Sequence, residues 1–458
     1  MCGIVGYCGR AIPVERVISR LSMIAHRGKD YYGLTDGKKT VYGLQSIGQS
    51  GQFFLGHALH AVIGFVSQPI NNCFVANCEI YNWVEVAVKY NVTANNDAEL
   101  LYKLLTQKGI ECLDELDGDY AFAWKNGNRI MLARDIIGVK PLWWYQEGDS
   151  LWFASENKAL DKKGTLLDPR KILIADDKGV SFSDRTFPAS VEKEYTMKQA
   201  ADNVAILLKE AVRKRVANID KIAILFSGGI DSTTLATIAK SLHKDVRLYV
   251  AGTENSEDLR WAKKIAQELG LPLKVSICTQ IEQEAKEVIP IIETGDVMKV
   301  SVALPFHFAC RLAHEDGCKV ILSGLGSEEL FAGYQRHKVT KNVNEECLKG
   351  LLAMYERDLY RDDTITMVHQ LELRLPFLDK ALIAFTLSVP GSLKITPELD
   401  KAVLRQAALL LGVPEEVAYR KKRAAQYGSG IDKALTKLAK AKSMTKKEYL
   451  YALGETNV

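Results

Sequence analysis

A glycine-rich turn at Ser227–Ser232, with the sequence Ser-Gly-Gly-Ile-Asp-Ser, could bind a phosphate group. It follows the apolar run Lys221–Phe226, which predicts a short buried strand, and it precedes a helical pattern that begins at Thr233. Glycines let the backbone approach an anion closely, and the free N–H groups of a helix start attract it. The turn matches neither a Walker loop nor Gly-x-Gly-x-x-Gly spacing. An ordinary strand-to-helix turn is the alternative, but it would not need Asp231 and two serines beside the glycines.

A second candidate for chemistry is Cys2, which follows the initial methionine. Methionine before a small residue is normally removed, and its removal would leave Cys2 with a free α-amino group. Such a group titrates near pH ~7.7–8.0 and can serve as general base for the thiol of the same residue. The pattern indicates an N-terminal nucleophile, and an incidental thiol is the alternative.

Length and composition limit the classes of protein to consider. The chain has 458 residues, enough for two domains with separate cores. Its net charge of +4 is too small to indicate a nucleic-acid partner. Nine scattered cysteines, no signal peptide and no apolar run of membrane length predict a cytoplasmic protein with reduced thiols and no membrane partner. The stretch Lys433–Lys447 predicts a solvated helix face, with RNA or membrane contact as the lesser alternative.

The C-terminal half alternates short apolar runs with helical patterns, which predicts a parallel sheet covered by helices. The strand candidates are 222–226, 247–251, 273–277 and 319–323. Ser256–Gly270 has acidic residues in its first turn and a glycine at its end, as expected of a helix. Ligands of such sheets bind at the carboxyl ends of the strands, where Ser227, Ala251–Gly252 and Ser323–Gly324 would all lie.

The N-terminal half shows a different pattern. An amphipathic helix is predicted from Val14 to Ile24, and a strand over Cys73–Ala76 precedes the polar motif Asn77–Asn82. A further helix is predicted to open at Asn96–Glu99. The aromatic region Leu142–Phe153 predicts antiparallel hairpins.

Motifs in the first third of the chain resemble, in order and spacing, the class II glutamine amidotransferase domain. They are Cys2–Gly6, His26–Asp30, Asn77–Asn82, Asp97, Leu113–Ala123, Ala133–Leu142 and Phe153–Glu156. The resemblance implies a four-layer αββα sandwich of the N-terminal nucleophile type. It also implies that Cys2 attacks the side-chain amide of glutamine and forms a thioester.

The same resemblance implies the remaining glutaminase residues. The Asn77 side chain and the backbone N–H of Cys78 would form the oxyanion hole. Glu79 and Asp97 would hold the substrate α-ammonium, although a helix N-cap explains Asp97 equally well on its own. The glutamine-binding residues are then Val62, Asn77, Cys78, Glu79 and Asp97.

The turn at Ser227–Ser232 resembles the pyrophosphate loop of ATP pyrophosphatases, and later segments resemble the asparagine synthetase family. Those segments are Ser323–Tyr334, His369–Asp379, Lys401–Arg405 and Tyr419–Lys422. The resemblance assigns Mg²⁺ to Asp231 and Glu328, and charge stabilisation of the acyl-adenylate and pyrophosphate to Lys422, which on its own would be a solvated surface lysine. It assigns ATP binding to Phe226, Ser227, Gly228, Gly229, Asp231, Ser232, Ala251, Ser323 and Gly324.

The amidotransferase motifs depart from the family pattern at Cys78, where the family has glycine, and at Leu59, where it has arginine. A non-glycine residue keeps the backbone donor if its φ and ψ are ordinary. Leucine cannot clamp the glutamine carboxylate as arginine does. His60 or Arg27 are the candidates to replace it.

The synthetase motifs depart at Leu325, where the family has a glutamate linked to intermediate formation or ammonia deprotonation. Leucine cannot be a general base. Either Glu328 or Glu329 replaces that glutamate, or the acceptor acid differs.

We therefore predict a mixed α/β and α+β protein, in which an N-terminal nucleophile sandwich precedes a parallel-sheet ATP-pyrophosphatase domain. The predicted segments are 2–160 for the glutaminase, 161–200 for closing strands and a linker, 201–430 for the synthetase-like domain and 431–458 for a basic tail. The predicted activity is ATP-dependent amidation of aspartate through β-aspartyl-AMP, with ammonia from glutamine. The substrates are glutamine, aspartate and ATP, the cofactor is Mg²⁺, and a homodimer is compatible with this interpretation.

Several alternatives stay open. A ligase of the same architecture could act on another carboxylate, or it could close a β-lactam-like ring, which an intact Cys2 disfavours because ring closure needs no ammonia. A catalytically degraded binding protein would not need Cys2, Asn77, Asp231, Ser232 and Lys422 together. A nucleic-acid thiolation enzyme would need a basic RNA-binding domain, and none is evident.

Overall fold

The computed structural model of the chain describes residues 2–44, 47–62, 64–188, 191–242, 245–420 and 428–455. The chain divides into two compact units, Met1–Phe187 with Met354–Asp363 and Pro188–Ala353 with Thr364–Val458. Nothing in the sequence pattern indicated that 354–363 joins the first unit. Within the described ranges, none of the helices combines the length and the apolar character that crossing a bilayer requires.

The first unit contains an antiparallel sheet with strand order β10–β8–β9–β1–β4–β2–β3 and another with the order β12–β11–β7–β6–β5. Its strands are β1 (Gly3–Pro13), β2 (Tyr31–Thr35), β3 (Thr40–Tyr42), β4 (Ser50–Leu59), β5 (Phe74–Ile80), β6 (Gly118–Asn126), β7 (Arg129–Arg134), β8 (Trp143–Glu147), β9 (Ser150–Ala154), β10 (Thr165–Leu166), β11 (Lys171–Asp176) and β12 (Gly179–Asp184). Its helices include α1 (Val14–Met23), α2 (Trp83–Tyr90) and α3 (Asp97–Lys108).

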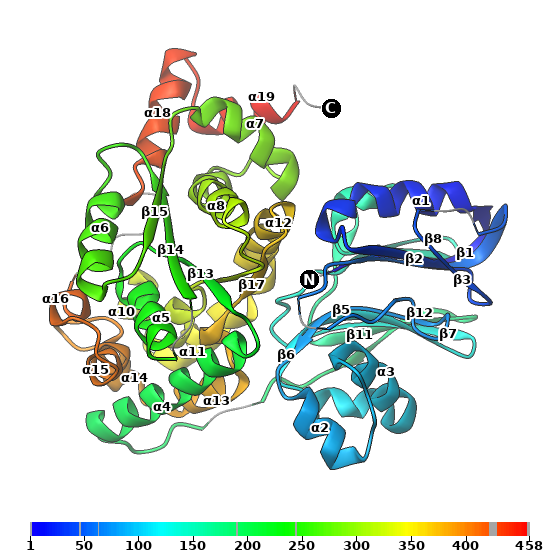
Figure 1. Cartoon of the computed structure of the whole chain (residues 1–458), viewed down its shortest axis with the longest axis horizontal. Helices are drawn as coiled ribbons and strands as arrows, with labels where there is room; N and C mark the ends of the chain where they lie inside the picture. Colours follow the sequence, from blue (N-terminus) through cyan, green and yellow to red (C-terminus); the bar gives the residue numbers. More distant parts are fainter. Residues whose placement is uncertain are drawn as a thin grey trace. The chain divides into compact units, whose positions relative to one another are not determined.

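The two sheets pack face to face, and helices cover their outer faces (Figure 1). Helix α1 buries its apolar stripe, including Val17 and Leu21, against the sheet that holds β1. Helix α3 buries Leu101 and Leu104 against the sheet that holds β5. Strands covered on both sides bury both alternating sets of side chains, which explains their apolar sequences. The predicted αββα sandwich and the antiparallel hairpin of β8 and β9 are confirmed.

The second unit is built on a parallel sheet with strand order β15–β14–β13–β16–β17. Its strands are β13 (Lys221–Leu225), β14 (Asp245–Gly252), β15 (Leu273–Ile277), β16 (Val320–Leu322) and β17 (Glu372–Arg374). Its main helices are α4 (Met197–Val216), α5 (Ile230–Ser241), α6 (Glu257–Leu269), α7 (Ile281–Ile292), α8 (Val297–Glu315), α11 (Val343–Leu352), α13 (Lys380–Ser388), α15 (Ala402–Leu410), α18 (Ile431–Ala441) and α19 (Lys446–Glu455), and α12 (Tyr360–Val368) runs across the unit boundary. Shorter helical segments are α9 (Ser327–Leu330), α10 (Gln335–Val339), α14 (Gly391–Lys394) and α16 (Glu415–Ala418).

Helices lie on both faces of this parallel sheet, with α8 on one face and α5 and α6 on the other (Figure 1). The predicted fold class is therefore confirmed, and each of the four predicted strands is present within one or two residues at its ends. Strand β17 was not predicted, because its residues Glu372 and Arg374 are charged and form an ion pair inside the protein.

The structure moves two predicted boundaries in the functional motifs. Helix α5 begins at Ile230 and not at Thr233, because Gly229 takes an extended conformation and caps it. Asp231 and Ser232 therefore lie in the first helical turn. Strand β5 continues through Ile80, so the motif that starts at Asn77 lies on the strand and does not follow it.

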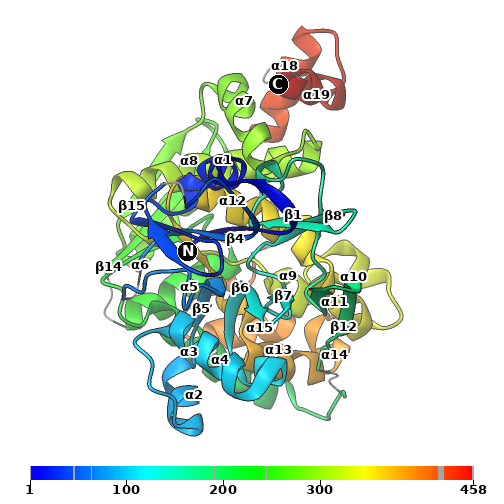
Figure 2. The same cartoon turned by 90° about the vertical axis from the view of Figure 1, so that its right-hand side faces the viewer.

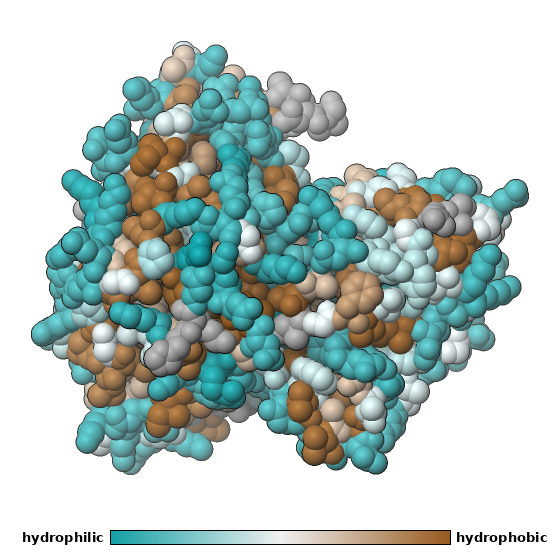
Figure 3. Space-filling view, in the orientation of Figure 1, coloured by the Kyte–Doolittle hydropathy of each residue, from teal (hydrophilic) through white to brown (hydrophobic). Residues whose placement is uncertain are grey.

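The lysine-rich C-terminal stretch forms α18 and α19, which lie beside α7 in both views (Figures 1 and 2). Helix α18 buries Ile431, Leu435 and Ala439 on one face, and Lys433 and Lys437 are exposed on the other. The visible surface over α18 is largely hydrophilic (Figure 3). The predicted solvated helix face is therefore confirmed.

Candidate active sites

Cys2 lies at the start of β1 in the first unit and is buried, with 7% of its surface exposed. Its main-chain nitrogen donates a hydrogen bond to Asn77 Oδ1 at 2.8 Å. Its carbonyl oxygen accepts one from Arg27 Nε at 3.1 Å. Asn77 is thereby oriented with its Nδ2 buried, and this nitrogen has no partner within the part of the chain that the structure describes. An amide donor is therefore available beside the thiol.

The backbone N–H of Cys78 faces the open edge of β5. Alternate N–H groups of an edge strand point away from its neighbour. On β5, Ala76 N donates to Gln68 Oε1 at 2.7 Å, and Ile80 N donates to Asp97 Oδ2 at 3.0 Å, so both leave the sheet. Cys78 lies two residues from each of them, so its N–H points in the same direction as theirs, away from β6. Its φ is not in the left-handed region, so the side chain is tolerated where the family has glycine.

The Cys78 thiol is not a competing nucleophile. Burial raises its pKa well above the usual value, and the neighbouring Asp97, Cys2 and Glu79 raise it further. The thiol therefore stays protonated at neutral pH, and a neutral thiol is a poor nucleophile.

Asp97 is fixed by the backbone and does not cap α3. Its carboxylate accepts hydrogen bonds from Ile80 N at 3.0 Å and from Ala98 N at 2.8 Å. The N-cap is Asn96, whose side chain accepts from Glu99 N, so the N-cap interpretation of Asp97 is wrong. Of the other predicted glutamine-binding residues, Glu79 lies on β5 beside Cys78, and Val62 is half-buried after β4.

Arg27 cannot replace the arginine that the family has at Leu59. Its side chain is fully buried, and its Nη1 lies 2.8 Å from Glu156 Oε1. Its Nη1 also lies 2.8 Å from Asp363 Oδ2, and its Nε donates to Cys2 O, so the guanidinium is paired with two carboxylates and the main chain of the nucleophile. His60 is also buried, with Nδ1 at 3.7 Å from Asp30 Oδ2. His60 therefore stays the candidate of the two for the glutamine carboxylate.

Glu156 is the fixed anion of this cluster. Burial alone would raise the pKa of its carboxyl, but His26, Lys158 and Arg27 lower it far below its usual range. Glu156 thus stays ionised at neutral pH and anchors Arg27, which explains the Ser-Glu end of the motif Phe153–Glu156.

The predicted ATP residues of the second unit gather at the carboxyl ends of β13, β14 and β16. The turn that contains Ser227 follows β13, Ala251 lies near the end of β14, and Ser323 follows β16. Gly228 has a φ of +69°, which favours glycine. A Cβ on Gly324 would lie 2.8 Å from the Asp231 Cβ, so glycine lets the two loops approach closely.

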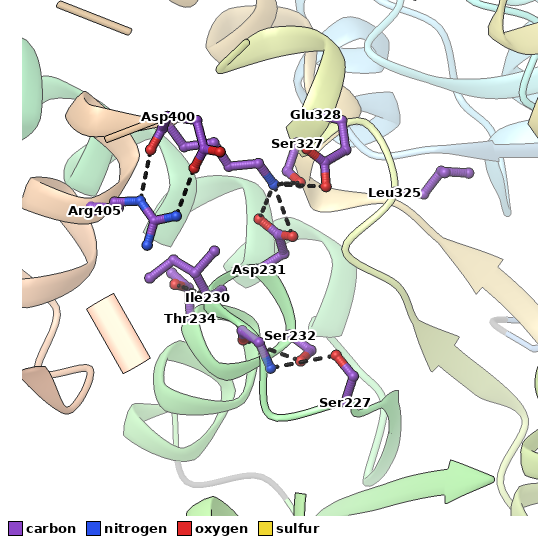
Figure 4. A network of polar contacts seen from close by, with 12 residues as sticks. Ser227, Ile230, Asp231, Ser232, Thr234, Leu325, Ser327, Glu328, Asp400 and Arg405 are labelled. Carbon is purple, nitrogen blue, oxygen red and sulfur yellow. Dashed lines mark hydrogen bonds and ion pairs between the residues drawn. The ribbon is translucent and has the colours of Figure 1, made fainter. Parts of the chain in front are cut away.

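Asp231 and Glu328, the predicted magnesium ligands, both bind the ammonium of Lys401 (Figure 4). Lys401 Nζ lies 2.7 and 2.9 Å from the Asp231 oxygens and 3.1 Å from Glu328 Oε1, and it donates to Ser327 Oγ at 2.9 Å. The pKa of Lys401 is lowered, because the effect of burial outweighs the opposing effect of Asp231. Because both carboxylates converge on one cation, they fit a divalent cation as well. Lys422, the predicted charge-stabilising lysine, lies outside the described residues.

Within the described part of this loop, Glu328 and Glu329 both have partners already, so neither is available to replace the glutamate that the family has at Leu325. The Leu325 side chain points away from Asp231 and Glu328 (Figure 4). Glu329 is fully buried and accepts a hydrogen bond from Tyr334 Oη at 2.9 Å. Glu328 is paired with Lys401.

The segment Lys401–Arg405 matches the family order, but the sequence alone assigns no role to Lys401. The available signal was a lysine immediately before a helix in a segment that matches the family order. We predict that Lys401→Met lowers the free energy of unfolding of the second unit by about 3–5 kcal/mol, because the substitution leaves the buried Asp231 and the half-buried Glu328 without their cation. Magnesium should restore part of this loss. Urea unfolding with and without magnesium measures both effects.

Lys338→Met is the matched control. Lys338 is partly exposed and lies 3.4 Å from Asp400 Oδ2, and such exposed pairs contribute at most about 1 kcal/mol. Equal unfolding curves for Lys401→Met and Lys338→Met would contradict the role given to the buried ion pair.

The chain matches the family model described as glutamine amidotransferase domain over residues 1–174 and the model described as asparagine synthase over 203–350 and 337–452. These two halves define a glutamine-hydrolysing ligase that uses ATP and small-molecule substrates, the class that the sequence predicts.

A Methanocaldococcus jannaschii protein named "Putative asparagine synthetase [glutamine-hydrolyzing] 1" is 34% identical over 529 aligned residues, which cover 98% of this chain and 97% of that protein. The asparagine synthetase of Asparagus officinalis is 28% identical over 94% of this chain and 78% of its own length. That of Gallus gallus is 30% identical over 78% of this chain and 71% of its own length. The chain belongs to the asparagine synthase family.

Proposed function

We propose that this protein makes asparagine from aspartate, ATP and glutamine. The observation that carries the proposal is that one chain retains both the Cys2–Asn77 nucleophile site and the glycine turn with Asp231. Relatives named asparagine synthetase support it, since one of them aligns with nearly the whole chain. Two half-reactions on one chain are chemically sensible, because free ammonia at neutral pH is mostly the unreactive ammonium ion.

In the first half-reaction, Cys2 Sγ attacks the side-chain carbonyl carbon of glutamine. The Cys2 α-amino group, free once Met1 is removed, takes the thiol proton and gives it to the leaving nitrogen as the C–N bond breaks. Asn77 Nδ2 and the N–H of Cys78 stabilise the oxyanion, and Glu79 and Asp97 hold the substrate α-ammonium. Ammonia leaves, and water hydrolyses the thioester to glutamate and free Cys2.

In the second half-reaction, the aspartate β-carboxylate attacks the α-phosphorus of ATP, and pyrophosphate leaves. The backbone N–H groups of the turn at Ser227–Ser232 and the start of α5 hold the polyphosphate. Asp231 and Glu328 would hold magnesium, which supplies positive charge against the departing pyrophosphate. Ammonia then attacks the acyl carbon of β-aspartyl-AMP, and AMP departs to leave asparagine.

A related ligase that amidates a different carboxylate is the second candidate. Leu325 favours it, because this side chain cannot act as the base that the family has at that position. Leu59 leaves the residues that hydrolyse glutamine in place. It changes only how the carboxylate of glutamine is bound, because the family has arginine at this position.

The experiment that tests the proposal is pyrophosphate release from ATP and magnesium with ammonium chloride, with each candidate acid in turn. Release that depends on aspartate, with asparagine identified by its mass, supports the proposal. Release with another acid and none with aspartate would favour the second candidate.

A further inference from the structure

The turn at Ser227–Ser232 is held from outside by Trp261, a half-buried residue of α6. Its indole Nε1 donates a hydrogen bond to the carbonyl oxygen of Gly228 at 2.6 Å. The indole ring also packs closely against Gly228. A Cβ added to Gly228 would lie only 2.7 Å from Trp261 Cδ1. Nothing in the sequence motifs assigned a role to this tryptophan.

The hydrogen bond from Trp261 fixes which way the next amide points. In a planar trans peptide the C=O and N–H groups point in opposite directions. With the Gly228 carbonyl held by Trp261, the N–H of Gly229 points to the opposite side of the turn, where Ser227 Oγ lies 3.4 Å from the nitrogen. A phosphate that accepts a hydrogen bond from the Gly229 N–H would have to lie on that side of the turn.

This peptide is easily inverted without an external contact. It joins two glycines, which lack the Cβ that restricts φ and ψ, so the inverted orientation costs little in the backbone. An inverted peptide would present the Gly228 carbonyl oxygen to the anion in place of the Gly229 N–H. One repulsive group would then replace one hydrogen-bond donor.

Charged side chains hold Trp261 in position. The guanidinium carbon of Arg420 lies 4.4 Å from the centre of the indole ring, and Lys264 Nζ lies 5.1 Å from it. Arg420 also pairs with Glu257 Oε1 at 2.8 Å, on the first turn of the same helix. A cation over an indole face is attracted by the ring, and both the ring and the cation lose freedom.

We propose that Trp261 is a positioning residue of the pyrophosphate turn. Its indole N–H selects the orientation of the Gly228–Gly229 peptide in which the amide can donate to the polyphosphate of ATP. The inference rests on the proposed function, because it takes the turn to be the polyphosphate site.

Trp261→Phe tests the proposal, because it keeps an aromatic ring and removes the N–H. Calorimetry on the full chain with magnesium should show ATP and pyrophosphate each bound roughly threefold to tenfold more weakly, the loss of about one hydrogen bond. Adenosine affinity, glutamine hydrolysis and the unfolding temperature should stay near the wild-type values. Trp144→Phe, the same change in the other unit, should alter none of the affinities.

The outcomes separate the two claims. Wild-type affinity for ATP and pyrophosphate in Trp261→Phe would overturn the role of Trp261, and so would an equal loss for adenosine, which indicates packing alone. A wild-type protein that binds neither ATP nor pyrophosphate would instead remove the proposed function. If Trp261→Phe does not unfold cooperatively, Arg420→Gln provides the same comparison, with a smaller loss of pyrophosphate affinity expected and an unchanged affinity contradicting the proposal.

Discussion

Replacement of Cys2 by alanine is expected to abolish glutamine-dependent product formation and to leave ammonia-dependent formation in place. The glutamine-dependent rate should fall on the order of a thousandfold or more, because no other thiol near the oxyanion donors is a competent nucleophile. Cys78 is the neighbouring thiol, and its raised pKa keeps it protonated. The contacts of Cys2 with Asn77 and Arg27 use main-chain atoms, so alanine keeps them. Amide product measured with either nitrogen source checks the prediction.

Cys8→Ala is the matched control for this prediction. Cys8 is a half-buried thiol on the same strand, β1, and burial raises its pKa. It should leave both activities unchanged. Glutamine-dependent synthesis that persists in Cys2→Ala would show that the nucleophile has been assigned to the wrong residue.

Asp231→Asn is expected to lower pyrophosphate release by roughly a hundredfold or more with either nitrogen source, because it removes one of the two carboxylates that would hold magnesium against the departing pyrophosphate. Asparagine has nearly the same shape, so the effect reports the charge. The change also leaves Lys401 facing one carboxylate fewer. Glutamine hydrolysis, which we assign to the first unit, should continue, and a cooperative urea unfolding curve like that of the wild type shows that the second unit has folded.

Asp245→Asn is the control, because this aspartate lies at the start of β14 and pairs with Arg247 in a largely exposed position. It should release pyrophosphate at the wild-type rate. An Asp231→Asn protein that hydrolyses glutamine and also releases pyrophosphate normally would exclude the turn from the adenylation step.

The strands of the second unit could be predicted because β13, β14 and β16 are apolar runs buried on both sides. Strand β17 could not, because it has three residues and its charges are neutralised by the pair Arg374–Glu372. The positions of the motifs could be predicted from the sequence more reliably than the residues at which helices begin. The start of α5 moved to Ile230 because the conformation of Gly229, and not any periodicity, decides it.

The site could be predicted where a motif places several groups together, as at Asn77–Glu79. It could not be predicted where a contact joins distant segments. Lys401 meets Asp231 across 170 residues, and Trp261 meets Gly228 across 33. Arg27 was a candidate for the glutamine carboxylate because burial cannot be seen in a sequence, and the structure commits it to Glu156 and Cys2.

The most direct test of the account uses glutamine labelled with ¹⁵N in its side-chain amide, together with aspartate, ATP and magnesium. We expect ¹⁵N in the side-chain amide of newly formed asparagine, with one AMP and one pyrophosphate for each amide made. Glutamine hydrolysis and ATP cleavage without labelled asparagine, or with the label in the amide of a different acid, would contradict it.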